Sequence, residues 1–92
     1  MMASLVSVFD TGDYEAWKET FDSDPGGRKQ SAQGHRIMRS VDDSNKVFVR
    51  TDFGSVDDAR EFRERLLASG ALDNITVVQE PTIVELADEA TY

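Results

Sequence analysis

The chain contains no cysteine, one histidine, two prolines and no long apolar segment. The absence of cysteine excludes a disulfide, a thiolate zinc site and a cysteine nucleophile. A composition without cysteine is typical of a reducing compartment, so we predict a cytoplasmic protein. No segment approaches the roughly 20 apolar residues of a membrane-spanning helix. One histidine and scattered carboxylates lack the converging spacing of metal ligands, so we expect no metal and no other cofactor.

Positive charge is also scarce, because 10 lysines and arginines stand against 18 acidic residues and give a formal net charge of -8. Such a protein is repelled by the phosphate backbone of nucleic acids and by anionic lipid surfaces. Neither nucleic acid nor a membrane is therefore an expected partner. A length of 92 residues predicts one domain over 1–92, with an ordered core at about 4–86.

The first half of the chain predicts a strand and then a helix. A β-rich segment at 5–9 ends at the turn-forming residues 10–12. Asp13 is placed to cap a helix that ends before Pro25. The spacing of three aromatic residues predicts that one face of this helix is buried; they are Tyr14, Trp17 and Phe21.

The second half predicts another helix and a last strand region. Ser55 is a plausible N-cap, and Gly70 is well placed just after the helix C-terminus. An apolar stripe again marks the buried face, and it consists of Val56, Ala59, Phe62 and Leu66. Residues 75–86 form the last predicted strand region. Pro81 within it predicts an edge position or a bulge. The part of the strand after Pro81 would then be free to pair elsewhere, including with another subunit.

Residues 33–53 predict a β-hairpin with a four-residue turn at 42–45, in which Asn45 adopts the left-handed conformation. This turn would place His35 opposite Asp52 on one face, together with the pairs Arg39–Phe48 and Ile37–Arg50. The other face would carry the pairs Arg36–Thr51, Met38–Val49 and Ser40–Val47. A three-residue turn would change these assignments, because a register shift of one residue moves side chains to the opposite face.

The elements therefore order as β-α-β-β-α-β, which predicts a four-stranded antiparallel sheet with two helices on one face. Both faces of this sheet would carry apolar residues, since Leu5 alternates with Val6 and Phe48 with Val49. Exposed apolar patches of that kind mark interfaces. We therefore predict a homodimer that forms through the open sheet faces.

Three segments carry a family resemblance: DYEAWKETFDSDPGGRK, GHRIMRSVDDSNKVFV and DFGSVDDAREFRERL. With the topology over residues 4–86, they resemble the dimeric α+β barrel superfamily, which includes antibiotic-biosynthesis monooxygenase-type and cyclase-like proteins. The resemblance implies a ferredoxin-like α+β fold, closure into a dimeric barrel, and a cavity near the sheet that holds an aromatic substrate in cofactor-free oxygenases. No diagnostic catalytic signature is shared.

RNA-recognition domains and metal chaperones of the same topology are set aside, since the first need a basic aromatic motif and the second a cysteine pair.

Two residues are candidates for proton transfer. His35 is the one side chain with an ordinary pKa near neutrality, and in the predicted register Asp52 would orient it as a carboxylate orients a general base. A structural cross-strand pair is the commoner role of such residues. Arg36, Arg39 and Arg50 are candidates to bind an acidic ligand, although exposed or structurally paired arginines are more common.

Three aromatic residues and one loop are candidates for ligand binding. Trp17, together with Tyr14, is suited to wall a pocket for an aromatic ligand, although aromatic residues at helical spacing usually belong to the core. Phe48 is a further ligand-binding candidate. The 25–29 loop combines glycine amides with Arg28 and Lys29 and so suits an anion, but a solvated turn is favoured because the context of a phosphate-binding loop is missing.

Three functions remain open. The first is a homodimer that binds a small molecule, aromatic molecules included, in a cavity beside the sheet. The second is a cofactor-independent monooxygenase or cyclase that acts on an aromatic polyketide-like substrate. The third is a non-catalytic structural or protein-interaction dimer, and the sequence does not decide whether the protein is an enzyme. A pocket enclosed by Trp17, Phe21, Phe62 and Met38 would favour the first two, whereas a filled core would favour the third.

Overall fold

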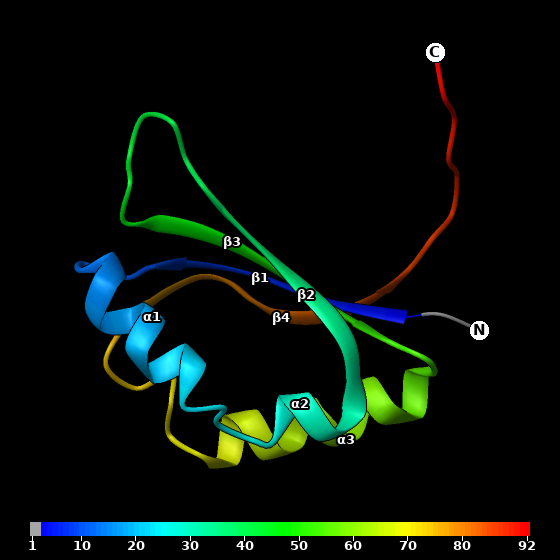
Figure 1. Ribbon diagram of the computed structural model, residues 1–92, viewed down its shortest axis with the longest axis horizontal. Coiled ribbons are helices and arrows are strands. Elements are labelled where there is room, and N and C mark those ends of the chain that lie inside the picture. The colour runs from blue at the N-terminus through cyan, green and yellow to red at the C-terminus, as the bar shows by residue number, and fades with distance from the viewer. Residues whose placement is uncertain (1–2) are drawn as a thin grey trace.

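A computed structural model describes residues 3–92, which form a four-stranded antiparallel sheet covered on one side by helices (Figure 1). The elements, in chain order, are β1 (Ala3–Asp10), α1 (Tyr14–Asp22), α2 (Arg28–Ser31), β2 (Ala32–Arg39), β3 (Lys46–Phe53), α3 (Val56–Ala68) and β4 (Thr76–Glu85). The strand order is β2-β3-β1-β4. This arrangement confirms the predicted ferredoxin-like α+β fold. The short helix α2 was not predicted, since residues 28–31 were expected to belong to a loop.

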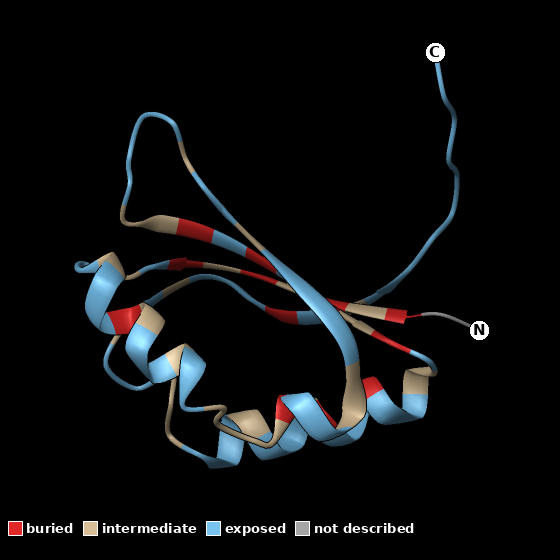
Figure 2. Cartoon of the chain, viewed as in Figure 1, coloured by how far each residue is buried: buried red, intermediate tan, exposed pale blue. Residues whose placement is uncertain are grey.

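The helix-facing side of the sheet follows from strict alternation along the two central strands. In β1, every second residue from Ala3 to Phe9 is buried, and in β3 the same holds from Val47 to Phe53 (Figure 2). Side chains in a strand point alternately to opposite faces, so these residues form the floor beneath the helices.

The helix boundaries agree with the capping residues of the sequence. The side chain of Asp13 accepts a hydrogen bond from the Ala16 amide at 3.2 Å, and that of Ser55 accepts one from the Asp58 amide at 3.1 Å. Gly70 follows α3 with a φ of +77°, which glycine adopts without steric cost. The two predicted N-caps and the predicted end of the second helix are confirmed.

The hairpin register is one residue away from the prediction. Ile37 pairs with Val49, Met38 with Phe48, and His35 with Thr51 rather than with Asp52. Asn45 does not take the left-handed turn conformation. It is held instead by the loop before α1, because its side chain accepts from the Tyr14 amide at 3.1 Å and donates to the Gly12 carbonyl at 3.1 Å.

The observed register also buries apolar side chains better than the predicted one. It places Ile37 beside Val49 on the helix side, whereas the predicted register placed Ile37 opposite Arg50. As a consequence, His35 lies on the helix side of the sheet with Thr51, and Asp52 lies on the opposite side with its neighbour Ser4.

Strand β4 lies at the edge of the sheet, and its pairing with β1 is irregular between Val6 and Phe9. Pro81 belongs to the same strand, where its carbonyl accepts a hydrogen bond from Arg63 Nε at 2.7 Å. The proline predicted an edge position or a bulge, because proline cannot donate to a strand ladder, and the edge position is confirmed. The second half of the strand was free to pair elsewhere in that prediction, but residues 82–85 pair with β1 of the same chain.

The sheet face that points away from the helices is uncovered by any element within residues 3–92. We call it the open face, and its apolar members are Val6, Val8, Met38, Phe48 and Val84. Phe48 is 39% exposed and Met38 48% exposed. Among the described residues, no helix is both long and apolar enough to span a membrane.

Candidate functional site

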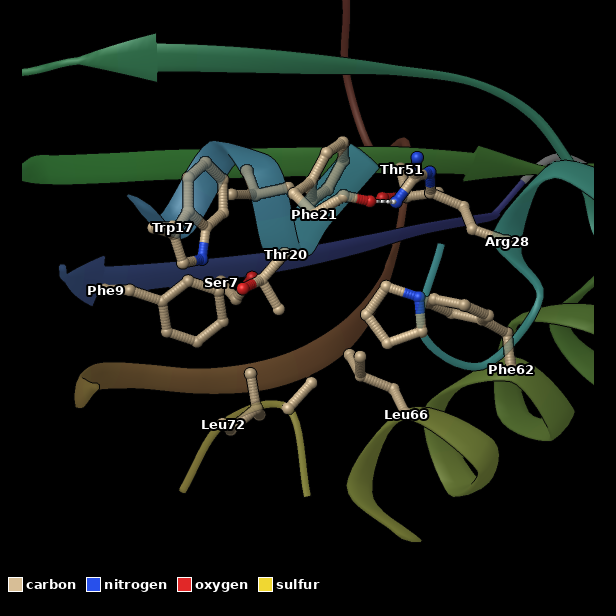
Figure 3. A pocket seen from close by; sticks show the side chains of 13 residues that line it. Ser7, Phe9, Trp17, Thr20, Phe21, Arg28, Thr51, Phe62, Leu66 and Leu72 are labelled. Atoms are coloured by element: carbon tan, nitrogen blue, oxygen red, sulfur yellow. Dashed lines mark hydrogen bonds between the residues drawn. The ribbon is translucent and has the colours of Figure 1, made fainter. Parts of the chain in front are cut away.

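The buried side of the sheet carries two separate apolar clusters rather than one. The cluster under α3 includes Leu5, Phe53 and Phe62. The cluster under α1 includes Phe9 and Trp17. Between them lies a cavity of about 50 Å³, bounded on the sheet side by β1 and β3 and on the helix side by α1, α3 and the segment before β4 (Figure 3).

The floor of the cavity carries two hydroxyl groups where an apolar core would carry methyl groups. Ser7 and Thr51 lie on the helix-facing side of β1 and β3, and they are only 7% and 4% exposed. Ser7 pairs with Val49 and Thr51 pairs with Leu5, so the two hydroxyl residues are diagonal neighbours. The polar positions thus coincide with the gap between the two clusters.

Aromatic rings from β1 and α1 form one wall of the cavity. The ring of Trp17 lies 6.5 Å from that of Phe9 and 5.2 Å from that of Phe21, measured between centroids. These are tilted contacts at the separations usual for aromatic pairs. Trp17, predicted as a ligand-binding candidate and as a core residue, therefore belongs to the apolar cluster and also borders the cavity.

Arg28 provides the charged group of the cavity, although it is the first residue of the short helix α2. The residue is only 4% exposed. Its Cζ lies 3.7 Å from the centroid of the Phe21 ring, and its Nη1 donates to the Phe21 carbonyl at 3.3 Å (Figure 3). Burial lowers the pKa of Arg28, while the carboxylates of Asp24 and Asp22 oppose this change.

His35 lies outside the cavity, on the edge strand β2. Its ring meets that of Phe21 edge-on at 4.9 Å between centroids. The residue is exposed overall, and its pKa is lowered mainly by partial desolvation and further by the positive charges of Arg28 and Lys18.

Asp52 lies on the open face, across the sheet from His35. Its Oδ1 accepts hydrogen bonds from Ser4 Oγ at 2.7 Å and from Arg50 Nε at 2.8 Å. The bond from Ser4 is the main cause that lowers the pKa of Asp52. The predicted pairing of His35 with Asp52 is therefore wrong, and the predicted catalytic role of either residue has to be considered without the other.

The remaining candidates also lie on the open face. Arg36 is directly opposite Arg50, and Phe48 is directly opposite Met38. They are separated from Trp17 by the sheet, so the structure does not bring the predicted ligand-binding residues together in one site. Met38, expected as a wall of the pocket, does not line it, whereas Trp17, Phe21 and Phe62 do.

The sequence did not mark Ser7 and Thr51 as site residues. The strand alternation carried a signal for Ser7, because it places this residue on the same face as Leu5 and Phe9. Thr51 required the correct hairpin register. Arg28 was named with Lys29 as part of a loop suited to an anion, but a solvated turn was favoured, and that expectation describes the exposed Lys29 and not the buried Arg28.

Comparison with known proteins gives matches at the level of structure alone. Neither a family model nor a curated protein matches the sequence. Rv0793 from Mycobacterium tuberculosis is similar in structure with a TM-score of 0.69 and 14% identity, over 99% of this chain and 100% of that one. A "putative antibiotic biosynthesis monooxygenase" from Bordetella bronchiseptica has a TM-score of 0.62 and 14% identity, over 97% and 98% of the two chains.

A protein of the same description from Nitrosomonas europaea has a TM-score of 0.61 and 16% identity, over 90% of this chain and 84% of that one. Identities this low establish a shared architecture and leave the chemistry open. The chain thus has the ferredoxin-like α+β fold found in antibiotic biosynthesis monooxygenase-like proteins, in agreement with the superfamily resemblance of its sequence.

Proposed function

We propose that the protein binds a small, largely apolar molecule in the cavity between the sheet and helices α1 and α3. The observation that carries this proposal is the interruption of the apolar core at Ser7 and Thr51. Small-molecule sites are typically apolar concavities with a few polar groups that fix the orientation of the ligand. Aromatic walls, two hydroxyl groups and the guanidinium of Arg28 give the cavity this character.

The cavity is small, but it lies next to a larger groove on the surface. A volume of about 50 Å³ accommodates a few water molecules, since one water needs roughly 10 to 15 Å³ on such a measure. The groove runs between α1 and the segment that follows α3, and it has a volume of about 400 Å³. Trp17, Thr20, Pro25 and Ala71 border both spaces. We infer that a ligand enters from this groove and displaces side chains at the shared boundary.

We also propose that the active form is a homodimer that forms through the open faces of two sheets. Five apolar side chains gather there without a covering element in the described chain, and such a patch on a small domain favours association. A two-fold dimer would cover the same patch in both copies. Arg36, Arg50 and Phe48, which the sequence suggested as ligand-binding residues, would lie in this interface.

The geometry supports binding more strongly than acid–base catalysis. A cofactor-independent monooxygenase or cyclase remains the alternative that the structural similarities favour. General acid–base catalysis works best with a group whose pKa lies near the working pH. The polar side-chain groups that border the cavity within residues 3–92 are hydroxyl groups, an indole and a guanidinium, whereas His35 contacts Phe21 but does not line the cavity.

The binding proposal is testable through Trp17, because it is the only tryptophan in the sequence. We expect titration with the neutral aromatic probe 2-naphthamide to shift the single indole N–H resonance in a ¹H–¹⁵N spectrum in a saturable manner. Ser7→Leu fills the floor of the cavity and is expected to weaken binding about tenfold or more. Ser44→Leu makes the same change in the exposed hairpin turn and should leave binding unchanged. An indole resonance that does not move at millimolar probe would contradict the proposal.

A further inference from the structure

We propose that the molecule bound in the cavity carries an acidic group, such as a carboxylate or an ionised enol or phenol, and that this group pairs with the guanidinium of Arg28. This inference rests on the binding function proposed above, and it assigns a charge and an anchor point to the ligand. The inference follows from the burial of Arg28, from its incomplete set of hydrogen bonds and from the positive side chains around it.

The guanidinium of Arg28 is buried and oriented, yet few of its donors are used. Its side chain is 5% exposed, and stacking on Phe21 fixes the plane of the guanidinium. An arginine side chain offers five N–H donors. Within residues 3–92, one hydrogen bond is formed, from Nη1 to the carbonyl of Phe21.

The counter-charge of Arg28 is weak. Asp24 Oδ1 lies 3.7 Å from Nη2, which is beyond hydrogen-bonding distance, and the same carboxylate also accepts from the Lys29 amide at 3.3 Å. A buried charge is costly unless it is paired and hydrogen-bonded. An anionic oxygen that accepts hydrogen bonds from the unused donors would complete the pairing of the guanidinium, which Asp24 neutralises only in part.

The unused donors of Arg28 keep some contact with solvent-accessible space. No fully buried side-chain nitrogen or oxygen in residues 3–92 lacks a hydrogen-bond partner. The Arg28 nitrogens that make no hydrogen bond are therefore not fully buried. Arg28 borders the cavity on one side and a surface depression of about 190 Å³ beside His35 on the other.

Positive side chains gather around Phe21 and His35, beside the carboxylates of Asp22 and Asp24, although the whole chain is acidic. Arg28 and Lys18 both contact the ring of Phe21, with the Lys18 Nζ at 5.9 Å from its centroid. The charges of Arg28, Lys18 and Lys29 all contribute to the lowered pKa of His35, against Asp22, which acts in the opposite direction. An acidic group is therefore favoured at this end of the cavity, whereas the net charge of -8 would repel it elsewhere.

A purely structural role for Arg28 makes a different prediction. The Phe21 carbonyl lies in the last turn of α1, where a positive charge is favourable. If Arg28 served only to hold this helix end, its replacement would lower stability and would not change which ligands are bound. The two roles therefore differ in ligand preference rather than in stability.

The test compares two probes of nearly the same size, 2-naphthoate and 2-naphthamide, with the Trp17 indole resonance as the readout. We expect the wild-type protein to bind the acid about tenfold or more tightly than the amide, because hydrogen bonds to charged groups are stronger than neutral ones. Arg28→Met should remove this preference and retain binding of the amide. Lys29→Met removes a neighbouring exposed charge and should preserve the preference.

Three results would overturn the inference. Equal wild-type affinity for the two probes would leave the binding function in place and refute the acidic ligand. A preference that persists in a folded Arg28→Met protein would refute Arg28 as the anchor. Failure of both probes to shift the indole resonance would refute the binding function and the inference together. If Arg28→Met does not fold, Arg28→Lys keeps the charge without the planar fork, and we expect it to reduce the preference without abolishing it.

Discussion

The imidazole of His35 lies in an environment that favours its neutral form. The residue is exposed overall, but its ring packs edge-on against Phe21, and partial desolvation together with the positive charges of Arg28 and Lys18 lowers its pKa below the ordinary value. Protonation therefore occurs more readily in the unfolded chain than in the folded protein. Because the unfolded state then binds more protons, the free energy of unfolding decreases as the pH falls below about 6.5, the ordinary pKa of histidine.

We expect His35→Gln to remove part of this pH dependence. Glutamine cannot gain a proton, so the fall in unfolding free energy between about pH 7 and about pH 5 should be shallower in the variant than in the wild-type protein. Urea unfolding at several pH values and at one protein concentration measures the slope. A slope identical to that of the wild type would show that His35 titrates normally in the folded state.

The connection between α1 and α2 is fixed to α3 by a close approach of two backbones. Gly26 has a φ of +78°, and a Cβ built there would lie 3.1 Å from the Leu66 amide nitrogen and 3.2 Å from Cε1 of Phe62. Arg65 Nε also donates to the Gly26 carbonyl at 2.7 Å. This contact holds Pro25 and Arg28 at the end of the cavity formed by Phe62 and Leu66.

Two neighbouring glycines separate the steric effect from the conformational effect. Gly27 has a similar φ of +72°, but nothing lies within 4 Å of the position of its Cβ. We expect Gly27→Ala to cost about 1 kcal/mol through backbone strain alone. Gly26→Ala adds a steric clash with α3, so it should cost about 2 to 3 kcal/mol in total.

Denaturant unfolding of both glycine variants at one protein concentration measures this difference. Equal losses in the two variants would show that the chain near Gly26 moves away from α3 without cost. The cavity wall made by Phe62 and Leu66 would then be adjustable rather than fixed.

Local rules were sufficient to predict the four strands and the helices α1 and α3, though not the short helix α2, and long-range contacts decided how the strands pair. The caps at Asp13 and Ser55 and the edge position of Pro81 depend on nearby residues, and each was predicted from the sequence. The hairpin register depends on Asn45, whose side chain is used by the loop before α1 more than 30 residues earlier in the chain. The pattern of apolar and polar residues within 33–53 therefore could not predict the register.

The same distinction explains why the candidate site was only partly predicted. Trp17, Phe21 and Phe62 lie on helix faces whose spacing marks them as buried, and they do line the cavity. The charged and polar members depend on tertiary structure, since Arg28 is buried by a close backbone contact and Thr51 by the strand register. His35 and Asp52 were paired because the turn was assumed to be four residues long, and a shift of one residue places them on opposite faces.

At the scale of the whole molecule, the open face combines apolar side chains with a polar network that is already paired. Ser4, Arg50 and Asp52 are linked by hydrogen bonds of 2.7 and 2.8 Å. A polar group with partners in its own chain loses less on transfer from water than an unpaired one. The apolar members of the open face include Phe48 and Val84, which are more than one-third exposed. A second copy can therefore cover them without leaving the charges of Arg50 and Asp52 buried and unpaired.

A single substitution at the centre of this face tests the dimer proposal. We expect the wild-type protein to sediment as a species of twice 10.3 kDa at micromolar concentration, and Phe48→Glu to sediment as a monomer. A carboxylate in the apolar interface would lose its hydration without gaining a partner. Leu67→Glu is the matched control, because Leu67 on α3 is 44% exposed, close to the 39% of Phe48, and lies on the far side of the molecule.

The control separates the effect of position from the effect of charge. Each variant exchanges one exposed apolar residue for one negative charge, so dissociation of Phe48→Glu alone places the interface on the open face. Dissociation of both variants would indicate a general effect of charge on an already acidic chain. A wild-type protein that remains a folded monomer would refute the dimer, while the cavity, which lies on the opposite side of the sheet and is lined by a single chain, would still be available to bind its ligand.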